Sequence, residues 1–280
     1  MHSCYASSSV IKKTTFVFIF KKMIETLILS IVQGITEFLP ISSSSHLILI
    51  SKFTNFQQQS LSIDISLHIG SFIAILTYFR RDIINFTKNK ELFFKILVSS
   101  IPIIFVGFFL LKTNLIEELR NIKVIAWTTI IFALLLYSSD KFKLVNNIEK
   151  NFNFKSALVI GLIQVVSLIP GVSRSGVTIT AARFLNFKRV DSAKISFLLS
   201  IPTLGAVSIY GLSNIFSSDI NFSILNVSAI IFAFFFSLLT IKYFIQYIRK
   251  FSLNLFVYYR IFLGIIIIYF AYLQNYGDKD

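Results

Sequence analysis

Long apolar stretches separated by short polar segments run through most of the 280 residues. A helix needs about 20 residues to cross the hydrocarbon core of a bilayer, or somewhat fewer if it stands upright. Stretches of this length are predicted to be membrane-spanning helices at about 63–79, 93–111, 123–139, 193–213, 223–247 and 254–274. The pattern therefore predicts an all-α, polytopic integral membrane protein.

Two further apolar stretches are each interrupted by a polar loop. The first covers about 24–39 and 43–52, and the second covers about 156–170 and 174–187. Pro40 removes a backbone donor, and the serines that follow it offer the backbone local alternatives to a helix. Irregular backbone at membrane depth persists only where protein or water satisfies its polar groups. We therefore predict two re-entrant pairs of short helices, each broken by a buried polar loop.

Composition agrees with a membrane protein and excludes several other classes. Hydrophobic residues make up 55% of the chain and charged residues 14%, with a mean hydropathy of +0.76, whereas about a quarter of an average soluble domain is charged. The single cysteine, Cys4, excludes an internal disulfide and a cysteine-based metal cluster. The net charge of +14 would suit nucleic acid, but the basic residues lie between apolar segments. We therefore expect them to face anionic membrane lipid and expect no nucleic-acid partner.

The distribution of lysine and arginine predicts the orientation in the membrane. Segments 80–95, 141–155, 188–194 and 242–250 together carry 15 of these residues, and the opposite side carries 5. Cytoplasmic loops carry the excess of basic residues, so we place these four segments in the cytoplasm. The first broken pair then enters from outside and the second from the cytoplasm. Both polar loops are expected to meet near the midplane.

An internal repeat agrees with this arrangement. The shared positions are Gln33, Pro40, Ser42 and Ser43 in the first half and Gln164, Pro170, Ser173, Arg174 and Ser175 in the second. Opposite entry sides and broken helices predict two inverted-topology repeats, at about 24–120 and 155–274. We expect them to form a single membrane domain over 23–280. Residues 1–22 carry four lysines that contradict an outside N-terminus, so we expect them to be an extension, with Met23 as the true start.

The second polar loop contains residue types that suit a phosphate group. Arg174 lies in a stretch whose other charge, Arg183, sits near the cytoplasmic end. A guanidinium at depth needs an anionic partner, and its planar fork matches phosphate. Glycines permit close backbone approach, and a helix N-terminus favours anions. The glycines are Gly171 and Gly176, and further donors are the hydroxyls of Ser173, Ser175 and Thr178. The alternative is that Arg174 forms a structural ion pair with Glu37.

The first polar loop carries an acid and a histidine. Over 26–51 the only ionisable side chains are Glu37 and His46, and an acid in an apolar stretch usually faces a wet cavity and carries function. Glu37 can bind a divalent cation or act as a base, with Gln33 one turn earlier on the same helix face. His46 is three residues from Ser43, close enough for a hydroxyl–imidazole pair. The alternative is that His46 is simply hydrogen-bonded.

Two other polar residues, which lie within predicted membrane spans, are interpreted as structural. His68 lies on the next predicted span, and Arg260 lies about six residues into the last one, from which its side chain can snorkel to the interface. The many Phe and Tyr residues are interpreted as lipid-facing bulk and interfacial belt.

The two loop motifs resemble the signatures of a known family. They read Gln-Gly-Ile-Thr-Glu-Phe-Leu-Pro-Ile-Ser-Ser-Ser-Ser-His at 33–46 and Pro-Gly-Val-Ser-Arg-Ser-Gly-Val-Thr at 170–178. Together they resemble those of the bacterial undecaprenyl-diphosphate phosphatases, also called bacitracin-resistance proteins, and the likeness runs from about Ile24 to Tyr272. The resemblance implies a multi-pass hydrolase of the bacterial plasma membrane with a site that opens outward. Such an enzyme converts undecaprenyl diphosphate to the monophosphate and recycles the lipid carrier for peptidoglycan and other cell-wall polymers.

The resemblance also implies roles for single residues and a divalent cation, Ca²⁺ or Mg²⁺. Glu37 and Gln33 fill the acidic motif, with Glu37 as metal ligand. Ser43, His46 and Arg174 fill the positions proposed for the nucleophile, its proton partner and the phosphate clamp. Further substrate contacts are expected from Gln33, Ser42, Ser173, Ser175 and Thr178. Two departures from the family pattern are Ser45, where Gly is usual, and Gln33, which leaves one carboxylate fewer than in members with Glu.

The expected reaction is phosphoryl transfer from the diphosphate terminus, with charge neutralisation and positioning as the main sources of catalysis. Either Ser43 attacks while His46 takes its proton, or His46 activates water. A polyprenyl-phosphate transporter is the main rival, because broken helices in inverted repeats are also transporter architecture. The acid-phosphatase-like lipid phosphatases fit less well, because Ser44-Ser45-His46 lacks their Pro-Ser-Gly context. Whether the protein forms oligomers stays open.

Overall fold

The computed structural model describes residues 3–54, 56, 60–86, 88–113, 118–119, 121–142, 145–217 and 222–277. Regular structure in this part is helical, apart from an isolated bridge between Asn146 and Phe187. In chain order the elements are α1 (Ser3–Thr36), α2 (Ser43–Phe53), α3 (Leu61–Tyr78), α4 (Arg80–Asn85), α5 (Lys90–Thr113), α7 (Ile122–Asp140), α8 (Ile148–Asn151), α9 (Phe154–Gln164), the 3-10 helix η1 (Val165–Leu168), α10 (Arg174–Phe184), α11 (Arg189–Ser217), α12 (Ile224–Lys250) and α13 (Asn254–Gly277).

Six of the described helices are long and apolar enough to cross a membrane. They are α3, α5, α7, α11, α12 and α13, and they coincide with the six predicted spans except at their ends. The prediction of an all-α, multi-pass membrane protein is confirmed at this level. Large side chains on the outer faces agree with it, because Phe105 and Phe262 are 72% and 66% exposed. Lipid is the solvent that favours such residues on a surface.

Small residues allow the helices to pack closely inside the bundle. Helix α12 packs against both α1 and α3. A Cβ atom added to Gly34 of α1 would lie 2.6 Å from the Cβ of Phe236 and 2.9 Å from the backbone nitrogen of Ser237. The side chain of the same Ser237 bonds Ser71 of α3 at 3.0 Å. Small residues at helix crossings and short polar bonds between helices are typical of membrane bundles.

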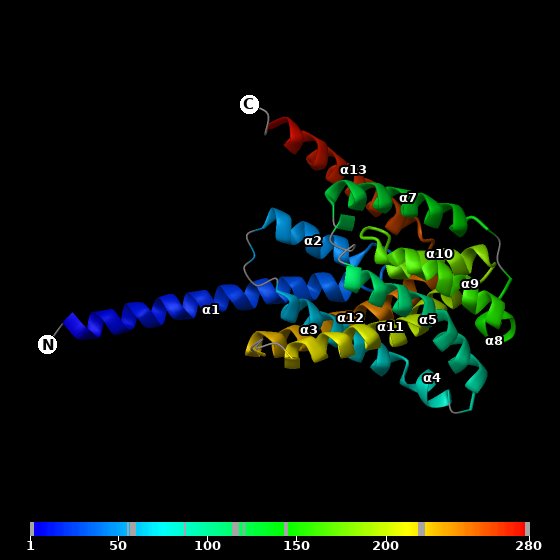
Figure 1. The fold of residues 1–280 in the computed structure, drawn as a ribbon, viewed down its shortest axis with the longest axis horizontal. Helices are drawn as coiled ribbons and strands as arrows, with labels where there is room; N and C mark the ends of the chain where they lie inside the picture. Colours follow the sequence, from blue (N-terminus) through cyan, green and yellow to red (C-terminus); the bar gives the residue numbers. More distant parts are fainter. Residues whose placement is uncertain are drawn as a thin grey trace.

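Helix α1 is longer than predicted. We expected a helix from about residue 24, whereas α1 begins at Ser3, and its N-terminal half extends beyond the other helices (Figure 1). No proline or glycine occurs between Ser3 and Gln33, so nothing in the local sequence ends the helix earlier.

At both predicted breaks a turn separates two helices. In the first, residues 37–42 join α1 to α2, and in the second, residues 169–173 join η1 to α10. The residue before each second helix has the same unusual backbone conformation: φ is 72° at Ser42 and 71° at Ser173. Positive φ is uncommon outside glycine, so the two turns resemble each other in backbone as well as in sequence.

The described part of the connection between α7 and α9 contains regular structure. It contains α8, and Asp140 at the end of α7 is buried. The carboxylate of Asp140 pairs with Arg183 of α10 at 3.0 Å and with Arg189 of α11 at 2.7 Å. It also accepts the backbone N–H of Leu253, just before α13, at 3.0 Å. Asp140 therefore joins four segments at this end of the bundle.

Candidate active site

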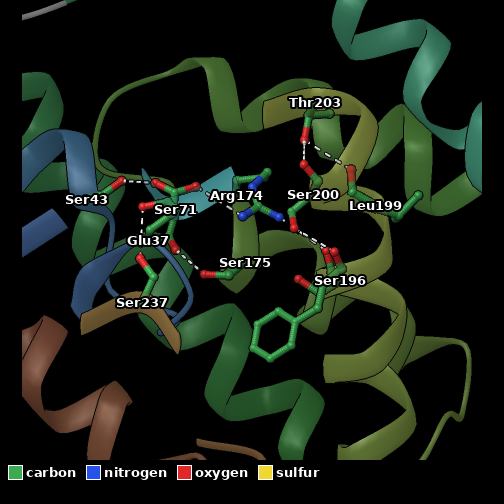
Figure 2. A network of polar contacts seen from close by, with 12 residues as sticks. Glu37, Ser43, Ser71, Arg174, Ser175, Ser196, Leu199, Ser200, Thr203 and Ser237 are labelled. Carbon is green, nitrogen blue, oxygen red and sulfur yellow. Dashed lines mark hydrogen bonds and ion pairs between the residues drawn. The ribbon is translucent and has the colours of Figure 1, made fainter. Parts of the chain in front are cut away.

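Glu37 lies in the turn directly after α1, with its side chain only 7% exposed. Its Oε2 atom accepts hydrogen bonds from Gln33 Nε2 at 3.1 Å and from Ser43 Oγ at 2.7 Å. Its Oε1 atom accepts one from Arg174 Nη2 at 3.1 Å. Figure 2 shows the side chains of Glu37, Ser43 and Arg174 converging from the two turns. The predicted meeting of the two polar loops is therefore present.

Arg174 is the first residue of α10, and its side chain is 12% exposed. Besides Glu37, it donates from Nη1 to the carbonyl of Ser196 on α11 at 3.2 Å. A cation at a helix N-terminus is unfavourable, because that end already carries partial positive charge. The first turn of α10 contains no acidic residue to offset it. The Glu37 carboxylate therefore faces two sources of positive charge, the Arg174 guanidinium and the N-terminus of α10. The remaining positive charge favours binding of a further anion.

Two of the predicted phosphate-binding hydroxyls bond within the protein. Ser175 Oγ donates to the carbonyl of Leu39 in the first turn at 2.7 Å, a second direct link between the two turns. Ser173 Oγ accepts the backbone N–H of Gly176 at 3.1 Å and so caps α10. Their hydroxyl groups lie 3.2 Å apart.

The hydroxyls of Thr178 and Ser42 are engaged in the same way. Thr178 Oγ1 lies 2.6 Å from Ser196 Oγ and donates to the carbonyl of Arg174 at 2.8 Å. Ser42 Oγ lies 2.9 Å from Ser45 Oγ. The serine at 45, where the family pattern usually has glycine, thus bonds the turn that precedes it. In this structure these hydroxyls fix the shape of the two turns.

His46 has a partner on both ring nitrogens, and neither is Ser43. Nδ1 lies 2.6 Å from the carbonyl oxygen of Ser42, and Nε2 lies 2.6 Å from the hydroxyl of Tyr259 on α13. The two rings are parallel within 7°. The expected Ser43–His46 pair is not formed, because Ser43 bonds Glu37 and the imidazole is held by Ser42 and Tyr259. Tyr259 is 213 positions away in the sequence, so local spacing gave no sign of it.

Arg260 does not snorkel to the membrane interface, and its described contacts are with backbone carbonyl oxygens. The side chain is fully buried, at 0% exposure, and it donates hydrogen bonds of 2.8–3.3 Å. The acceptors are the carbonyl oxygens of Pro40, Thr129, Gly171 and Val172. A Cβ atom on Gly176 would lie 2.9 Å from Arg260 Nη1, so this glycine makes room for the guanidinium. Arg260 thus ties α13 to both turns at once.

Gly171 has a local structural role, and His68 is bonded within its own helix. Gly171 has φ of +95°, and a Cβ atom there would lie 2.7 Å from the carbonyl oxygen of Ile125 on α7. Glycine is needed for both reasons. His68 Nδ1 lies 2.8 Å from the carbonyl oxygen of Asp64, one turn earlier in α3.

The described residues contain no group of three or more His, Cys, Asp or Glu side chains that would hold a metal ion by themselves. Near Glu37, however, Gln33 Oε1 is buried and has no hydrogen-bond partner. Mg²⁺ is often bound through one or two carboxylates together with substrate phosphates. A carboxylate, a free amide oxygen and the Ser43 hydroxyl fit a divalent cation that is shared with a phosphate ligand.

These features define a multi-pass helical membrane protein with an acid–arginine site between two similar turns. Comparison with known proteins identifies it further: the family model described as bacitracin resistance protein BacA matches residues 26–266. The undecaprenyl-diphosphatase of Pelagibacter ubique (strain HTCC1062) is 48% identical over 254 residues, covering 90% of this chain and 99% of that protein. The chain belongs to the bacitracin resistance protein family.

Two further relatives are similar over almost their whole length. The undecaprenyl-diphosphatase of Saccharophagus degradans is 40% identical over 256 residues, which are 86% of this chain and 96% of the relative. That of Jannaschia sp. (strain CCS1) is 37% identical over 260 residues, which are 88% and 97%.

Proposed function

We propose that this protein is an undecaprenyl-diphosphatase that hydrolyses undecaprenyl diphosphate to undecaprenyl phosphate and inorganic phosphate. Its role is to recycle the lipid carrier for cell-wall synthesis, which gives resistance to bacitracin. The observation that carries the proposal is the Glu37 carboxylate, which accepts bonds from the Ser43 hydroxyl and the Arg174 guanidinium. The proposed nucleophile Ser43 and the proposed phosphate-binding Arg174 are thus both hydrogen-bonded to the proposed base, Glu37. The names of the three relatives support the same activity.

Arg174 is the proposed binding group for the diphosphate. A guanidinium has five N–H donors in a planar fork, and Arg174 uses two of them on described groups, Glu37 and Ser196. The remaining donors and the N-terminus of α10 favour the phosphate oxygens, which carry negative charge. The hydroxyls of Ser42, Ser173, Ser175 and Thr178 and the amide of Gln33 would contact substrate by exchanging one of their internal bonds.

Ser43 is the proposed nucleophile. Its Oγ atom forms a bond to the terminal phosphorus, the bond from that phosphorus to the bridging oxygen breaks, and undecaprenyl phosphate leaves. The 2.7 Å bond to Glu37 supports this carboxylate as the first acceptor of the serine proton. Water then hydrolyses the phosphoserine and releases inorganic phosphate. In the alternative route water attacks the terminal phosphorus directly, and His46 takes its proton.

A divalent cation, Ca²⁺ or Mg²⁺, is proposed as a cofactor held by Glu37 and Gln33 Oε1. When bound, it would neutralise phosphate charge. Gln33 Oε1 is buried without a hydrogen-bond partner, which supports its availability as an additional oxygen ligand beside the single carboxylate.

The proposed setting is a pair of inverted repeats whose re-entrant helix pairs place the site near the midplane, open to the outer side. The shared sequence positions and the matching φ angles at Ser42 and Ser173 support the repeats, and the cytoplasmic excess of basic residues supports the orientation. An apolar groove of about 390 Å³ beside the first turn supports lateral entry of the polyprenyl tail from the bilayer. Ile35, Leu39 and Phe236 are among its lining residues.

The test is phosphate release by the purified, detergent-solubilised protein from undecaprenyl diphosphate, with and without a chelator. We expect one phosphate per substrate consumed, and loss of activity with the chelator that added Ca²⁺ or Mg²⁺ restores. No phosphate release, together with movement of polyprenyl phosphate across vesicle membranes, would instead indicate the transporter.

A further inference from the structure

The hydrogen bonds around His46 determine which ring nitrogen carries its proton. The carbonyl oxygen of Ser42 can only accept, so Nδ1, 2.6 Å away, must be the donor. A neutral imidazole has one N–H, which leaves Nε2 as the acceptor. The group that faces Nε2 is the hydroxyl of Tyr259, at 2.6 Å, and this hydroxyl must therefore donate.

We propose that Tyr259 is a positioning residue for the hydrolysis, acting through His46. Its hydroxyl holds the imidazole in the Nδ1–H tautomer and keeps the basic Nε2 atom in one direction. A phenol can both donate and accept. Tyr259 donates to Nε2 while Nε2 is unprotonated; when its O–H turns away, the Nε2 lone pair takes the proton from water, and the phenol oxygen then accepts the new Nε2–H. The proposal rests on the proposed function, in the route where water attacks the terminal phosphorus and His46 takes its proton.

The position of Tyr259 is itself fixed by its neighbour in the sequence. Arg260 is fully buried and bonds carbonyl oxygens in both turns, at Pro40 and at Gly171. This part of α13 is therefore anchored to the loops that carry the site. Tyr259 extends from the same anchored turn to His46 on α2, where the two rings are parallel within 7°.

The pairing also explains how Ser43 and His46 take separate roles although they lie three residues apart. Ser43 bonds Glu37 at 2.7 Å, while His46 is held by Ser42 and Tyr259. Without the Tyr259 hydroxyl the ring loses the Nε2 partner that the described residues provide, and rotation about its side-chain bonds becomes easier. Displacement of a catalytic group by about 1 Å is enough to reduce a rate by about a hundredfold.

The first experiment compares Tyr259→Phe with the matched control Tyr258→Phe in the full-length protein. Tyr258 is the adjacent tyrosine, 61% exposed on the outside of α13. We expect Tyr259→Phe to lower kcat by about tenfold to a hundredfold with KM within about twofold, because Arg174 still binds the diphosphate. Tyr258→Phe should match the wild type. Equal kcat for Tyr259→Phe and wild type would overturn the proposal.

A double-mutant cycle separates action through His46 from a general structural role. If Tyr259 acts through His46, then adding Tyr259→Phe to His46→Ala should cause no further loss of kcat. An equal fold loss in both backgrounds would refute the proposal. A wild-type protein that releases no phosphate would instead contradict the proposed function, which is a distinguishable result.

The tautomer of His46 gives a test in the wild-type protein that does not depend on catalytic rates. In ¹⁵N-histidine-labelled wild-type protein, with the His46 signals assigned by their loss in His46→Ala, Nδ1 should carry the hydrogen and Nε2 should not. The opposite tautomer at neutral pH would overturn the proposal.

Discussion

Helix α10 has an arginine at each end, and the two arginines are held in different ways. Arg174 is its first residue, donates to one carboxylate and one carbonyl, and is 12% exposed. Arg183 is in its last turn, pairs with Asp140 at 3.0 Å and is 3% exposed. It also donates to the carbonyl oxygens of Asp140, Phe142 and Phe187. The helix dipole favours a cation at the C-terminal end and disfavours one at the N-terminal end.

The acids that face these arginines differ too. The Asp140 carboxylate accepts hydrogen bonds from Arg189 and from the backbone of Leu253 in addition to pairing with Arg183. These donors lie on α10, on α11 and just before α13, so the Asp140 carboxylate connects those segments to α7. The Glu37 carboxylate instead accepts a bond from Ser43, a hydroxyl capable of attack. Both are buried ion pairs, but of the two the Glu37 pair lies beside a reactive hydroxyl and at a helix end that favours a further anion. We therefore assign a structural role to the Asp140 pair and a catalytic role to the Glu37 pair.

The largest effect is expected from Ser43→Ala. Removal of the nucleophile should abolish turnover, while substrate still binds and no burst of phosphate is seen. If water attacks directly, Ser43→Ala should keep part of its activity and His46→Ala should be the more damaging change. Mapping of a trapped phosphate to any residue other than Ser43 would exclude Ser43 as nucleophile.

Next in size is Arg174→Ala. A desolvated, charge-assisted contact is worth roughly 2–5 kcal/mol, so kcat/KM should fall by about thirtyfold to several thousandfold. Arg174→Lys should also lose most activity, because lysine retains the charge but lacks the planar fork. Phosphate release and the melting temperature are measured together, and melting should change little.

The structural ion-pair interpretation of Arg174 predicts the reverse pattern. Arg174→Ala would then leave Glu37 buried and unpaired and lower the melting temperature, and adding Glu37→Gln would restore the folded yield. Unstable single variants rescued by the double variant would show that the two ends of α10 do not differ as we infer.

Asp140→Asn tests the other end of the helix. An amide keeps the shape of the side chain but leaves two arginines without their counter-charge, so unfolding should become easier by about 3 kcal/mol. Activity per folded molecule should be unchanged, since the Asp140 contacts connect structural segments. The check is thermal melting beside phosphate release normalised to folded protein. A large fall in kcat at full folding would mean that this pair also serves the reaction.

Glu37→Gln is expected to reduce activity by about a hundredfold in protein that still inserts and folds, because the amide can neither take a proton well nor bind a cation strongly. Dependence on added Ca²⁺ or Mg²⁺ should weaken at the same time. Activity is measured across a metal titration after chelation. A variant that remains active with the metal dependence of the wild type would move the ligand role to another residue.

Part of this comparison could be made from the sequence and part could not. Charge-free runs located all six candidate spans, and the opposite entry sides of the two polar loops predicted that these loops meet. The direct contact between Glu37 and Arg174 was expected only in the alternative to the phosphate clamp. The hydropathy pattern predicts how deep in the membrane a residue lies but not which neighbouring helix its side chain faces. It therefore did not predict the bond between His46 and Tyr259 or the carbonyl oxygens around Arg260. Those contacts depend on how α13 packs against segments that lie 88 to 220 residues earlier in the chain.

The smallest effect is expected from Thr178→Val, which tests a hydroxyl first interpreted as a phosphate contact. Thr178 Oγ1 lies 2.6 Å from Ser196 Oγ and also donates to the carbonyl of Arg174, so its bonding capacity is used within the protein. Valine keeps the shape and removes these bonds, and a typical intramolecular hydrogen bond contributes about 1 kcal/mol. Since Ser196 also presents its carbonyl to Arg174, the guanidinium should shift slightly and kcat/KM should fall by only a few fold. Phosphate release beside that of Arg174→Ala measures the difference. A loss as large as that of Arg174→Ala would show that Thr178 exchanges its internal bonds for the phosphate and is part of the clamp itself.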